Sequence, residues 1–158
     1  TWIRKVVMKH GVQMVYIDYL QLITASNKKN GEDANRDLSE ISATLKGLAM
    51  ELEIPIFVLS QLNREVEKRA DKHPMLSDLR DSGTLEQNAD IVMFFYRPEY
   101  YKIGNYADGA STAGICEIEI AKFRNGETAM LWQRFNGALS RFEDYSNEPN
   151  YEPIDNPF

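Results

Sequence analysis

Residues 12–22 read VQMVYIDYLQL, an apolar run that is interrupted by the carboxylate of Asp18. A continuous apolar strand is the pattern expected when both faces of a parallel sheet are covered. Ligands of parallel α/β sheets collect at the carboxyl ends of the strands, where the loops form a crevice. The stretch therefore predicts an α/β fold in which Asp18 is placed to meet a ligand or its metal ion.

The neighbouring segments extend this pattern. Residues 2–10 predict the last turns of a helix, and the apolar residues of 33–53 recur at intervals of three and four, which predicts an amphipathic helix of about five turns. Residues 54–61, IPIFVLSQ, predict a second buried strand with Pro55 near its start. Strand, long helix and strand together predict a right-handed parallel crossover.

The second half of the chain changes character. Residues 62–82 carry many charges without a sustained apolar period, which predicts a long functional loop, and a short helix follows. Residues 89–97, ADIVMFFYR, predict a third strand of the buried type. Beyond residue 114 the apolar residues alternate, and the pairs Asn125–Gly126 and Asn136–Gly137 predict the tight turns of an antiparallel meander.

Composition restricts the class of protein. The 158 residues are 43% hydrophobic, enough for one domain over residues 1–145, whereas the acidic, proline-containing residues 146–158 are expected to stay disordered. With a net charge of -6, any contact with nucleic acid must be local. The single cysteine, Cys116, allows no internal disulfide, and no CxxC motif or Cys/His cluster has the spacing of zinc ligands. No apolar stretch approaches the length of a membrane span. We therefore expect a soluble, cytoplasmic protein.

Four polar residues are candidates for a site. An aspartate after a buried strand is the Walker B pattern, in which the carboxylate holds the Mg²⁺ of a nucleotide; Asp18 could equally cap a loop. The amide of Gln61 can accept from a water and donate to a phosphate oxygen, although such glutamines more often cap loops. Lys122 and Arg124 lie two apart on a strand and so leave it on one face, with ordinary surface cations as the alternative.

These residues belong to four segments: YIDYLQL (16–22), VLSQLNR (58–64), residues 69–97 and KFRNGE (122–127). In this order and with these spacings, the segments closely resemble the C-terminal motor domain of DnaB-type bacterial replicative helicases. The resemblance covers residues 1–145. It implies an α/β, RecA-like P-loop NTPase core that has a partial parallel sheet with helices and a C-terminal antiparallel β-meander.

The resemblance also implies an activity. Helicases of this family use ATP and Mg²⁺ to translocate on single-stranded DNA as a homohexameric ring during DNA replication. A primase and a helicase loader are the implied partners, and no membrane is involved. The alternatives are a RecA-like repair ATPase and a non-catalytic module that binds DNA or a partner.

Roles for the four candidate residues follow from the resemblance. Asp18 would support the Mg²⁺ of bound ATP, and Gln61 would sense the terminal phosphate and couple it to DNA. Lys122 and Arg124 would reach into the nucleotide site of the neighbouring subunit as trans-acting cations. These four residues form the implied catalytic set.

Two further groups of residues are implied to contact ligands. The family's DLRxSG loop lines the central channel and grips DNA phosphates largely through backbone N–H groups, and Arg80, Asp81 and Gly83 take those positions. The family more often has glutamate where this chain has Asp81. Tyr96 and Arg97, at a strand end, could approach the nucleotide base, although core packing is the simpler interpretation of Tyr96.

One expected element is missing from the sequence. The chain contains no GxxxxGK[ST] phosphate loop, and the family's catalytic glutamate lies upstream of the matching segment, so we expect this chain alone to bind ATP negligibly. In the family the phosphate-loop strand lies between the strands that end near Ser60 and begin near Asp90. Its absence should open a gap, expose strand edges and favour swapped or aggregated association. Residues 27–30 are a second candidate channel segment, with a solvated turn as the alternative.

Overall fold

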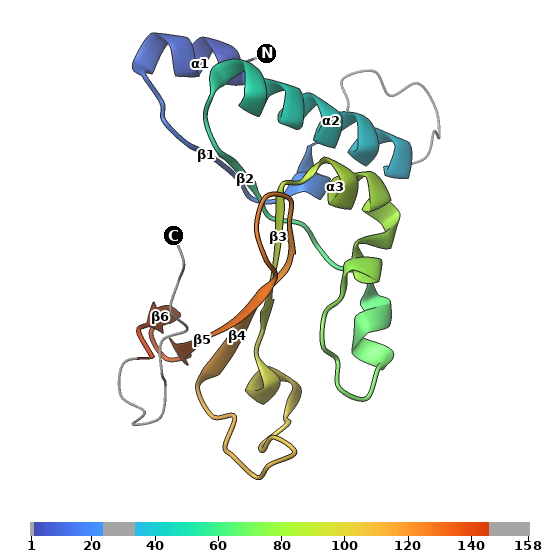
Figure 1. Ribbon diagram of the computed structural model, residues 1–158, viewed down its shortest axis with the longest axis vertical. Coiled ribbons are helices and arrows are strands. Elements are labelled where there is room, and N and C mark those ends of the chain that lie inside the picture. Colours follow the sequence, from blue (N-terminus) through green and yellow to red (C-terminus); the bar gives the residue numbers. More distant parts are fainter. Residues whose placement is uncertain (1, 24–33, 146–158) are drawn as a thin grey trace.

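The computed structural model describes residues 2–23 and 34–145, without the side chains of residues 34–37 and 80–83. Within these ranges the strands form two sheets that are not hydrogen-bonded to each other (Figure 1). One sheet is the parallel pair of β1 (Val15–Ile17) and β2 (Ile56–Val58). The other is antiparallel and contains, in order, β3 (Ile91–Tyr96), β4 (Ile115–Phe123), β5 (Ala129–Asn136) and β6 (Arg141–Glu143). The α/β class is confirmed.

The predicted strand–helix–strand unit is confirmed. Helix α2 (Ala34–Leu52) lies between β1 and β2 in the sequence, and the two strands are parallel. Leu38 and Leu45 from α2 pack against the fully buried Leu20, and this cluster also contacts both strands. The apolar stripe read from the sequence is therefore the face of α2 that forms the core.

Helix α1 (Trp2–His10) lies beside α2 (Figure 1). It ends at Gly11, whose φ of 64° belongs to the left-handed region that glycine adopts at helix ends. The Arg4 guanidinium donates to both carboxylate oxygens of Glu51, at 2.7 and 2.6 Å, and so ties α1 to the end of α2. Among the described residues, no helix is both long and apolar enough to cross a membrane.

Strand β3 differs from the prediction. Its side chains alternate between core and solvent: Val92, Phe94 and Tyr96 are buried, whereas Ile91, Met93 and Phe95 are exposed. The expectation of a strand covered on both faces was wrong for the described part of the chain, because β3 pairs with β4 in an antiparallel sheet that leaves one face open. β2 and β3 lie in different sheets, which agrees with the expected gap between them.

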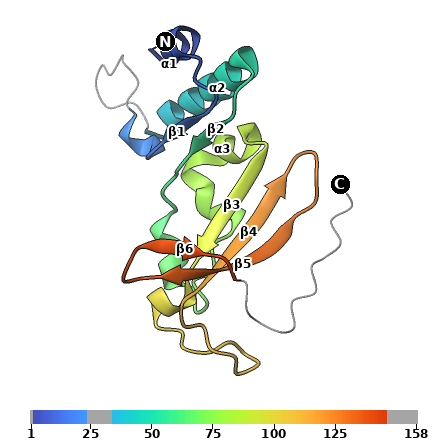
Figure 2. The same cartoon turned by 90° about the vertical axis from the view of Figure 1, so that its left-hand side faces the viewer.

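The segment predicted as a long loop is partly helical. It contains two short 3₁₀ helices, η2 (Arg64–Lys68) and η3 (Leu76–Ser82), and is followed by the predicted short helix, α3 (Gly83–Asn88). Figure 2 shows α1, α2 and the β1–β2 pair at one end of the molecule, with the antiparallel sheet extending away from them. The segment of residues 62–82 runs alongside both this end and the antiparallel sheet.

The meander is confirmed. β4 ends just before Asn125–Gly126 and β5 begins shortly after it, so this pair lies in the first hairpin turn. Asn136–Gly137 marks the second turn, between β5 and β6. The predicted disordered tail, residues 146–158, and the candidate channel residues 27–30 lie outside the described residues.

Candidate functional site

Asp18 and Gln61 follow the carboxyl ends of the two parallel strands, β1 and β2. The pairing of Ile17 with Val58 places the carboxyl ends of β1 and β2 side by side. The ladder continues past Asp18, because the Leu59 N–H donates to the Ile17 carbonyl at 2.9 Å and the Leu20 N–H donates to the Leu59 carbonyl at 2.9 Å. Both Asp18 and Gln61 are exposed at this edge, as expected for residues that meet a ligand.

The surroundings of Asp18 fit a magnesium–nucleotide complex. Among the described residues, no hydrogen bond or ion pair engages its carboxylate, and no group of three or more metal-binding side chains is present. Mg²⁺ usually keeps several waters and takes only one or two protein carboxylates beside substrate phosphates. An accessible carboxylate at a strand end is therefore the kind of group that could hold Mg²⁺ together with the phosphates of a nucleotide.

Lys122 and Arg124 cap the end of α3. The Lys122 ammonium donates to the Glu86 carbonyl, and the Arg124 guanidinium donates to the Gln87 carbonyl at 2.7 Å. Cations at these carbonyls complement the negative end of a helix. Both side chains contact α3, and Arg124 is also exposed, so its contact with α3 leaves the alternative of a surface cation open.

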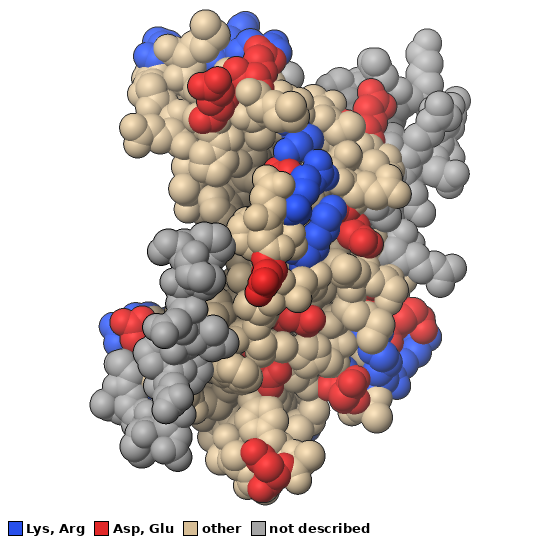
Figure 3. Space-filling model, viewed as in Figure 1, with Lys and Arg blue, Asp and Glu red and all other residues tan. Residues whose placement is uncertain are grey.

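A third cation joins this pair around Asp90. The Lys46 ammonium lies 2.5 Å from the Asp90 carboxylate, and the Arg124 Nε lies 3.5 Å from it. Lys46 lowers the pKa of the Asp90 carboxyl, with smaller contributions from Arg124 and Lys122. Three cations around one carboxylate leave this cluster net positive, and Figure 3 shows a patch of Lys and Arg near the middle of this face.

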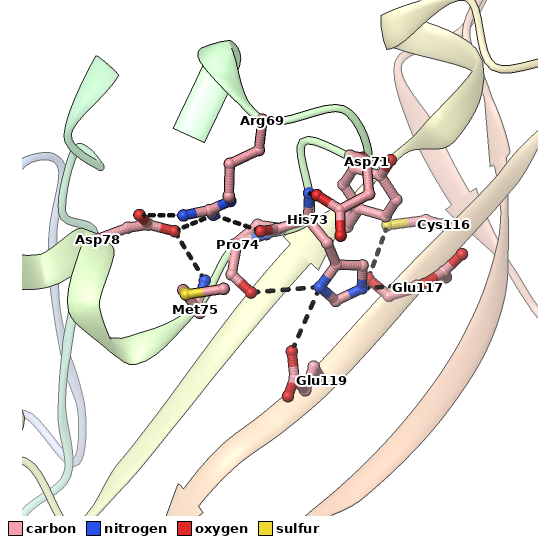
Figure 4. A network of polar contacts seen from close by, with 10 residues as sticks. Arg69, Asp71, His73, Pro74, Met75, Asp78, Cys116, Glu117 and Glu119 are labelled. Atoms are coloured by element: carbon pink, nitrogen blue, oxygen red, sulfur yellow. Dashed lines mark hydrogen bonds and ion pairs between the residues drawn. The ribbon is translucent and has the colours of Figure 1, made fainter. Parts of the chain in front are cut away.

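The backbone that leads to the predicted DNA-binding residues is firmly anchored. Arg80 and Asp81 lie in η3, and Gly83 begins α3; the side chains there are outside the description. Just before them, the buried Asp78 carboxylate accepts two hydrogen bonds from the Arg69 guanidinium, at 2.8 and 2.5 Å (Figure 4). The Arg69 guanidinium lowers the pKa of that carboxyl, and desolvation opposes the change.

His73 connects the same segment to β4. Its Nε2 lies 3.2 Å from a Glu117 carboxylate oxygen, and its Nδ1 lies 3.2 Å from the Pro74 carbonyl and 3.7 Å from Glu119 (Figure 4). The buried Glu117 also accepts from the Tyr106 hydroxyl at 2.7 Å. Burial, followed by this hydrogen bond, raises the pKa of the Tyr106 phenol. Reasoning from the sequence assigned no role to His73 and missed this contact; the two glutamates spaced two apart on one strand were the available signal.

Tyr96 and Arg97 lie apart from the other candidates. β3 leads away from the ends of β1 and β2, so the structure does not bring its last residues together with Asp18 (Figure 1). Tyr96 is buried: its hydroxyl donates to the Asp71 carbonyl, and its ring centroid lies 4.6 Å from that of His73. The Arg97 guanidinium stacks 3.7 Å above the Phe135 ring. Contact of Tyr96 and Arg97 with a nucleotide base stays a prediction.

Comparison with known proteins identifies relatives. The family model described as "DnaB-like helicase C terminal domain" matches residues 1–144. The replicative DNA helicase DnaB of Buchnera aphidicola is 45% identical over 139 residues, which is 88% of this chain and 29% of that protein. The corresponding helicase of Geobacillus stearothermophilus gives the same values, 45% over 139 residues, 88% and 29%. A probable plasmid replicative DNA helicase of Chlamydia psittaci is 46% identical over 132 residues, 84% of this chain and 27% of that protein.

Solved structures show the same relationship. A solved ATPase domain superposes with a TM-score of 0.77 at 39% identity, and the match covers 90% of this chain and 49% of that one. A DnaB-like replicative helicase, solved to show its interactions with primase, gives a TM-score of 0.76 at 39% identity, with 90% and 33% covered. The chain spans 27% to 29% of the length of the curated relatives named above.

Proposed function

Because the chain belongs to the DnaB-like helicase C-terminal domain family, we propose that it is part of the motor of a replicative DNA helicase. This helicase hydrolyses ATP and unwinds duplex DNA by translocating on single-stranded DNA as a homohexameric ring. The observation that carries the proposal is the parallel pairing of β1 with β2, because it brings Asp18 and Gln61 to one sheet edge. The relatives named as replicative helicases favour this function over a RecA-like repair ATPase or a non-catalytic module.

Asp18 and Gln61 would serve the bound nucleotide. Asp18 would hold Mg²⁺, which when bound neutralises charge on the ATP phosphates. Gln61 would offer its amide to the terminal phosphate or to the attacking water, because an amide both donates and accepts hydrogen bonds. The exposure of both side chains supports this assignment, since a ligand can reach them from solvent.

Lys122 and Arg124 would act on the nucleotide of the neighbouring subunit. A guanidinium supplied in this way offsets the charge that develops on the transferred phosphoryl group. The surplus of positive charge supports the assignment, since Lys46 already neutralises the one carboxylate of the cluster. On this proposal no subunit has a complete site by itself, which is the physical reason for a ring.

Arg80, Asp81 and Gly83 would face single-stranded DNA. Backbone N–H groups and one arginine per subunit, repeated around a ring, can hold phosphates without a basic surface, which fits the net charge of -6. The buried anchor at Asp78 supports this role, because it fixes the backbone two residues before Arg80. Primase is a proposed partner because a related helicase was solved to show its interactions with primase; a helicase loader is a further expected partner.

Hydrolysis of ATP by the intact parent helicase tests the proposal. Arg124→Ala is expected to lower DNA-stimulated turnover by about 10³-fold, the lower end of the effect of such an arginine, in a ring that sedimentation shows to be intact. Arg134→Ala removes an exposed arginine from β5 and is the matched control, with turnover expected to stay at the wild-type level. Unchanged turnover in Arg124→Ala would refute the roles proposed for these residues in ATP hydrolysis and would favour a non-catalytic module.

Mixed rings separate action in trans from a local role in capping α3. Rings made only of Asp18→Asn subunits or only of Arg124→Ala subunits are expected to be inactive. In a mixed ring, some interfaces join the intact Asp18 of one subunit to the intact Arg124 of its neighbour. Turnover should therefore recover on mixing, whereas a purely local defect would give no recovery.

A further inference from the structure

The side chain of Gln21 is bonded to the backbone of Gln61 in both directions. Its Nε2 donates to the Gln61 carbonyl at 3.3 Å and to the Ser60 hydroxyl at 3.1 Å, and its Oε1 accepts from the Gln61 N–H at 3.3 Å. Only this orientation of the amide satisfies both backbone groups, because the reverse would set donor against donor and acceptor against acceptor. The amide replaces the strand pairing that ends at Leu20 and Leu59.

The backbone that carries Gln21 is itself fixed. Gln21 lies in the 3₁₀ helix η1 (Leu20–Leu22), which begins two residues after Asp18. Leu20 is fully buried in the cluster with Leu38 and Leu45, and its N–H is bonded to the Leu59 carbonyl. Gln21 therefore projects from a core-anchored position, and a flexible loop does not intervene between Asp18 and the amide that holds Gln61.

We propose that Gln21 is a positioning residue that sets the backbone of Gln61 relative to the carboxylate of Asp18. This inference rests on the proposed function, in which Gln61 serves the terminal phosphate and Asp18 serves its Mg²⁺. The backbone ladder between the two segments ends at Leu20 and Leu59, and Gln61 lies two residues beyond it. The amide of Gln21 links the segment after β1 to the segment after β2. The distance between the Asp18 carboxylate and the Gln61 backbone is therefore fixed before a nucleotide binds.

Steady-state hydrolysis by the intact parent helicase tests this role. Gln21→Leu removes the amide while keeping a side chain of similar size. We expect the DNA-stimulated kcat to fall about 10- to 100-fold, because a small displacement of a reacting group has an effect of that order, while the KM for ATP stays near the wild-type value. Gln13→Leu, at an exposed glutamine before β1, is the matched control and should behave as wild type. Ser60→Ala removes one of the three contacts and should lower kcat in the same direction by less.

A double-mutant cycle separates positioning from a general structural effect. If Gln21 acts through Gln61, adding Gln21→Leu to Gln61→Ala should cause no further loss of kcat. Wild-type kcat in Gln21→Leu, or fully additive losses in the cycle, would overturn the proposal. If Gln21→Leu does not assemble, the Ser60→Ala result decides alone.

Two further variants separate failure of the positioning role from failure of the proposed function. Unchanged hydrolysis in Asp18→Asn and Gln61→Ala would refute the proposed function, and the positioning role with it. Loss of hydrolysis in those two variants, together with wild-type hydrolysis in Gln21→Leu, would refute the positioning role alone.

Discussion

Asp78 illustrates, at the scale of single residues, how one buried carboxylate depends on its partners. Its side chain is 5% exposed and accepts two hydrogen bonds from Arg69 and one from the Met75 N–H at 2.8 Å. Removing one partner from a buried charged pair leaves the other uncompensated. The Asp78 carbonyl also accepts from the Asn63 N–H at 3.0 Å, so the same residue ties together both ends of the segment before α3.

Asp78→Asn is expected to lower the free energy of unfolding at neutral pH by about 3 kcal/mol, because it leaves Arg69 without its charged partner. The pKa of Asp78 is lower in the folded than in the unfolded state, so its stabilisation is present above the unfolded pKa and is lost as the pH falls through the folded pKa. Urea denaturation should therefore show a difference between wild type and variant that shrinks steeply below about pH 4.

The control for this prediction is Glu65→Gln, which breaks the exposed pair between Glu65 and Lys68. Exposed pairs contribute little, so this variant should unfold like the wild type at both pH values. A difference for Asp78→Asn that is the same in acid as at neutral pH would contradict a charge-based role. It would point to packing as the cause.

Helix α2 shows, at the scale of elements, how one face of a helix supports a site that lies elsewhere. Leu38 and Leu45 bury Leu20, and Leu20 in turn fixes η1, the 3₁₀ helix that carries Gln21. The opposite face of α2 carries exposed side chains such as Met50. The helix therefore supports the backbone beside Asp18 through packing, and its Lys46 also pairs with Asp90 beside Lys122 and Arg124.

Leu45→Ala is expected to destabilise the chain by about 2 to 4 kcal/mol, because it removes buried methyl groups and leaves a cavity beside Leu20. Met50→Ala lies on the same helix with its side chain 67% exposed, and it should change the free energy of unfolding by less than about 0.5 kcal/mol. Urea denaturation of both variants measures the difference. Equal effects of the two substitutions would mean that the apolar stripe of α2 is not the packed face.

Features that depend on residues close together in the sequence could be predicted, whereas contacts between distant residues could not. The β1–α2–β2 unit and the position of Asp18 at a strand end follow from periodicity within short windows. The contact between His73 and Glu117 joins residues 44 apart and leaves no local pattern. An apolar run such as β3 shows that a strand is buried, but it does not show which face is covered. The partners of Gln21 depend on where the backbone leaves the ladder, which spacing alone does not show.

An open apolar face is the main feature at the scale of the whole molecule. Phe95, Ile118 and Leu131 lie in one row across β3, β4 and β5; Phe95 and Leu131 are 53% and 43% exposed, and Ile118 between them is buried. The Phe142 ring of β6 lies 6.0 Å from that of Phe95 and extends the row. Exposed apolar side chains that lie close together favour association.

We expect the chain alone to self-associate through this face, and Phe95→Glu to shift it toward monomer, because a charge there opposes burial of the row. Sedimentation velocity over a range of concentrations measures the effect. Tyr100→Glu introduces the same charge at a side chain that is 71% exposed on η4 (Pro98–Tyr101), and it should leave association unchanged. A wild-type chain that stays monomeric at every concentration would rule out association through this face.

Helix α3 joins two of the proposed sites end to end. It starts at Gly83, in the segment proposed to face DNA, and near its other end the carbonyls of Glu86 and Gln87 are held by Lys122 and Arg124. Its six residues span about 9 Å. On the proposed function, a displacement of the DNA strand at Gly83 would be transmitted along this short, rigid helix to the two cations. Binding of DNA at Gly83 and the position of Lys122 and Arg124 beside the neighbouring subunit's nucleotide would then be coupled.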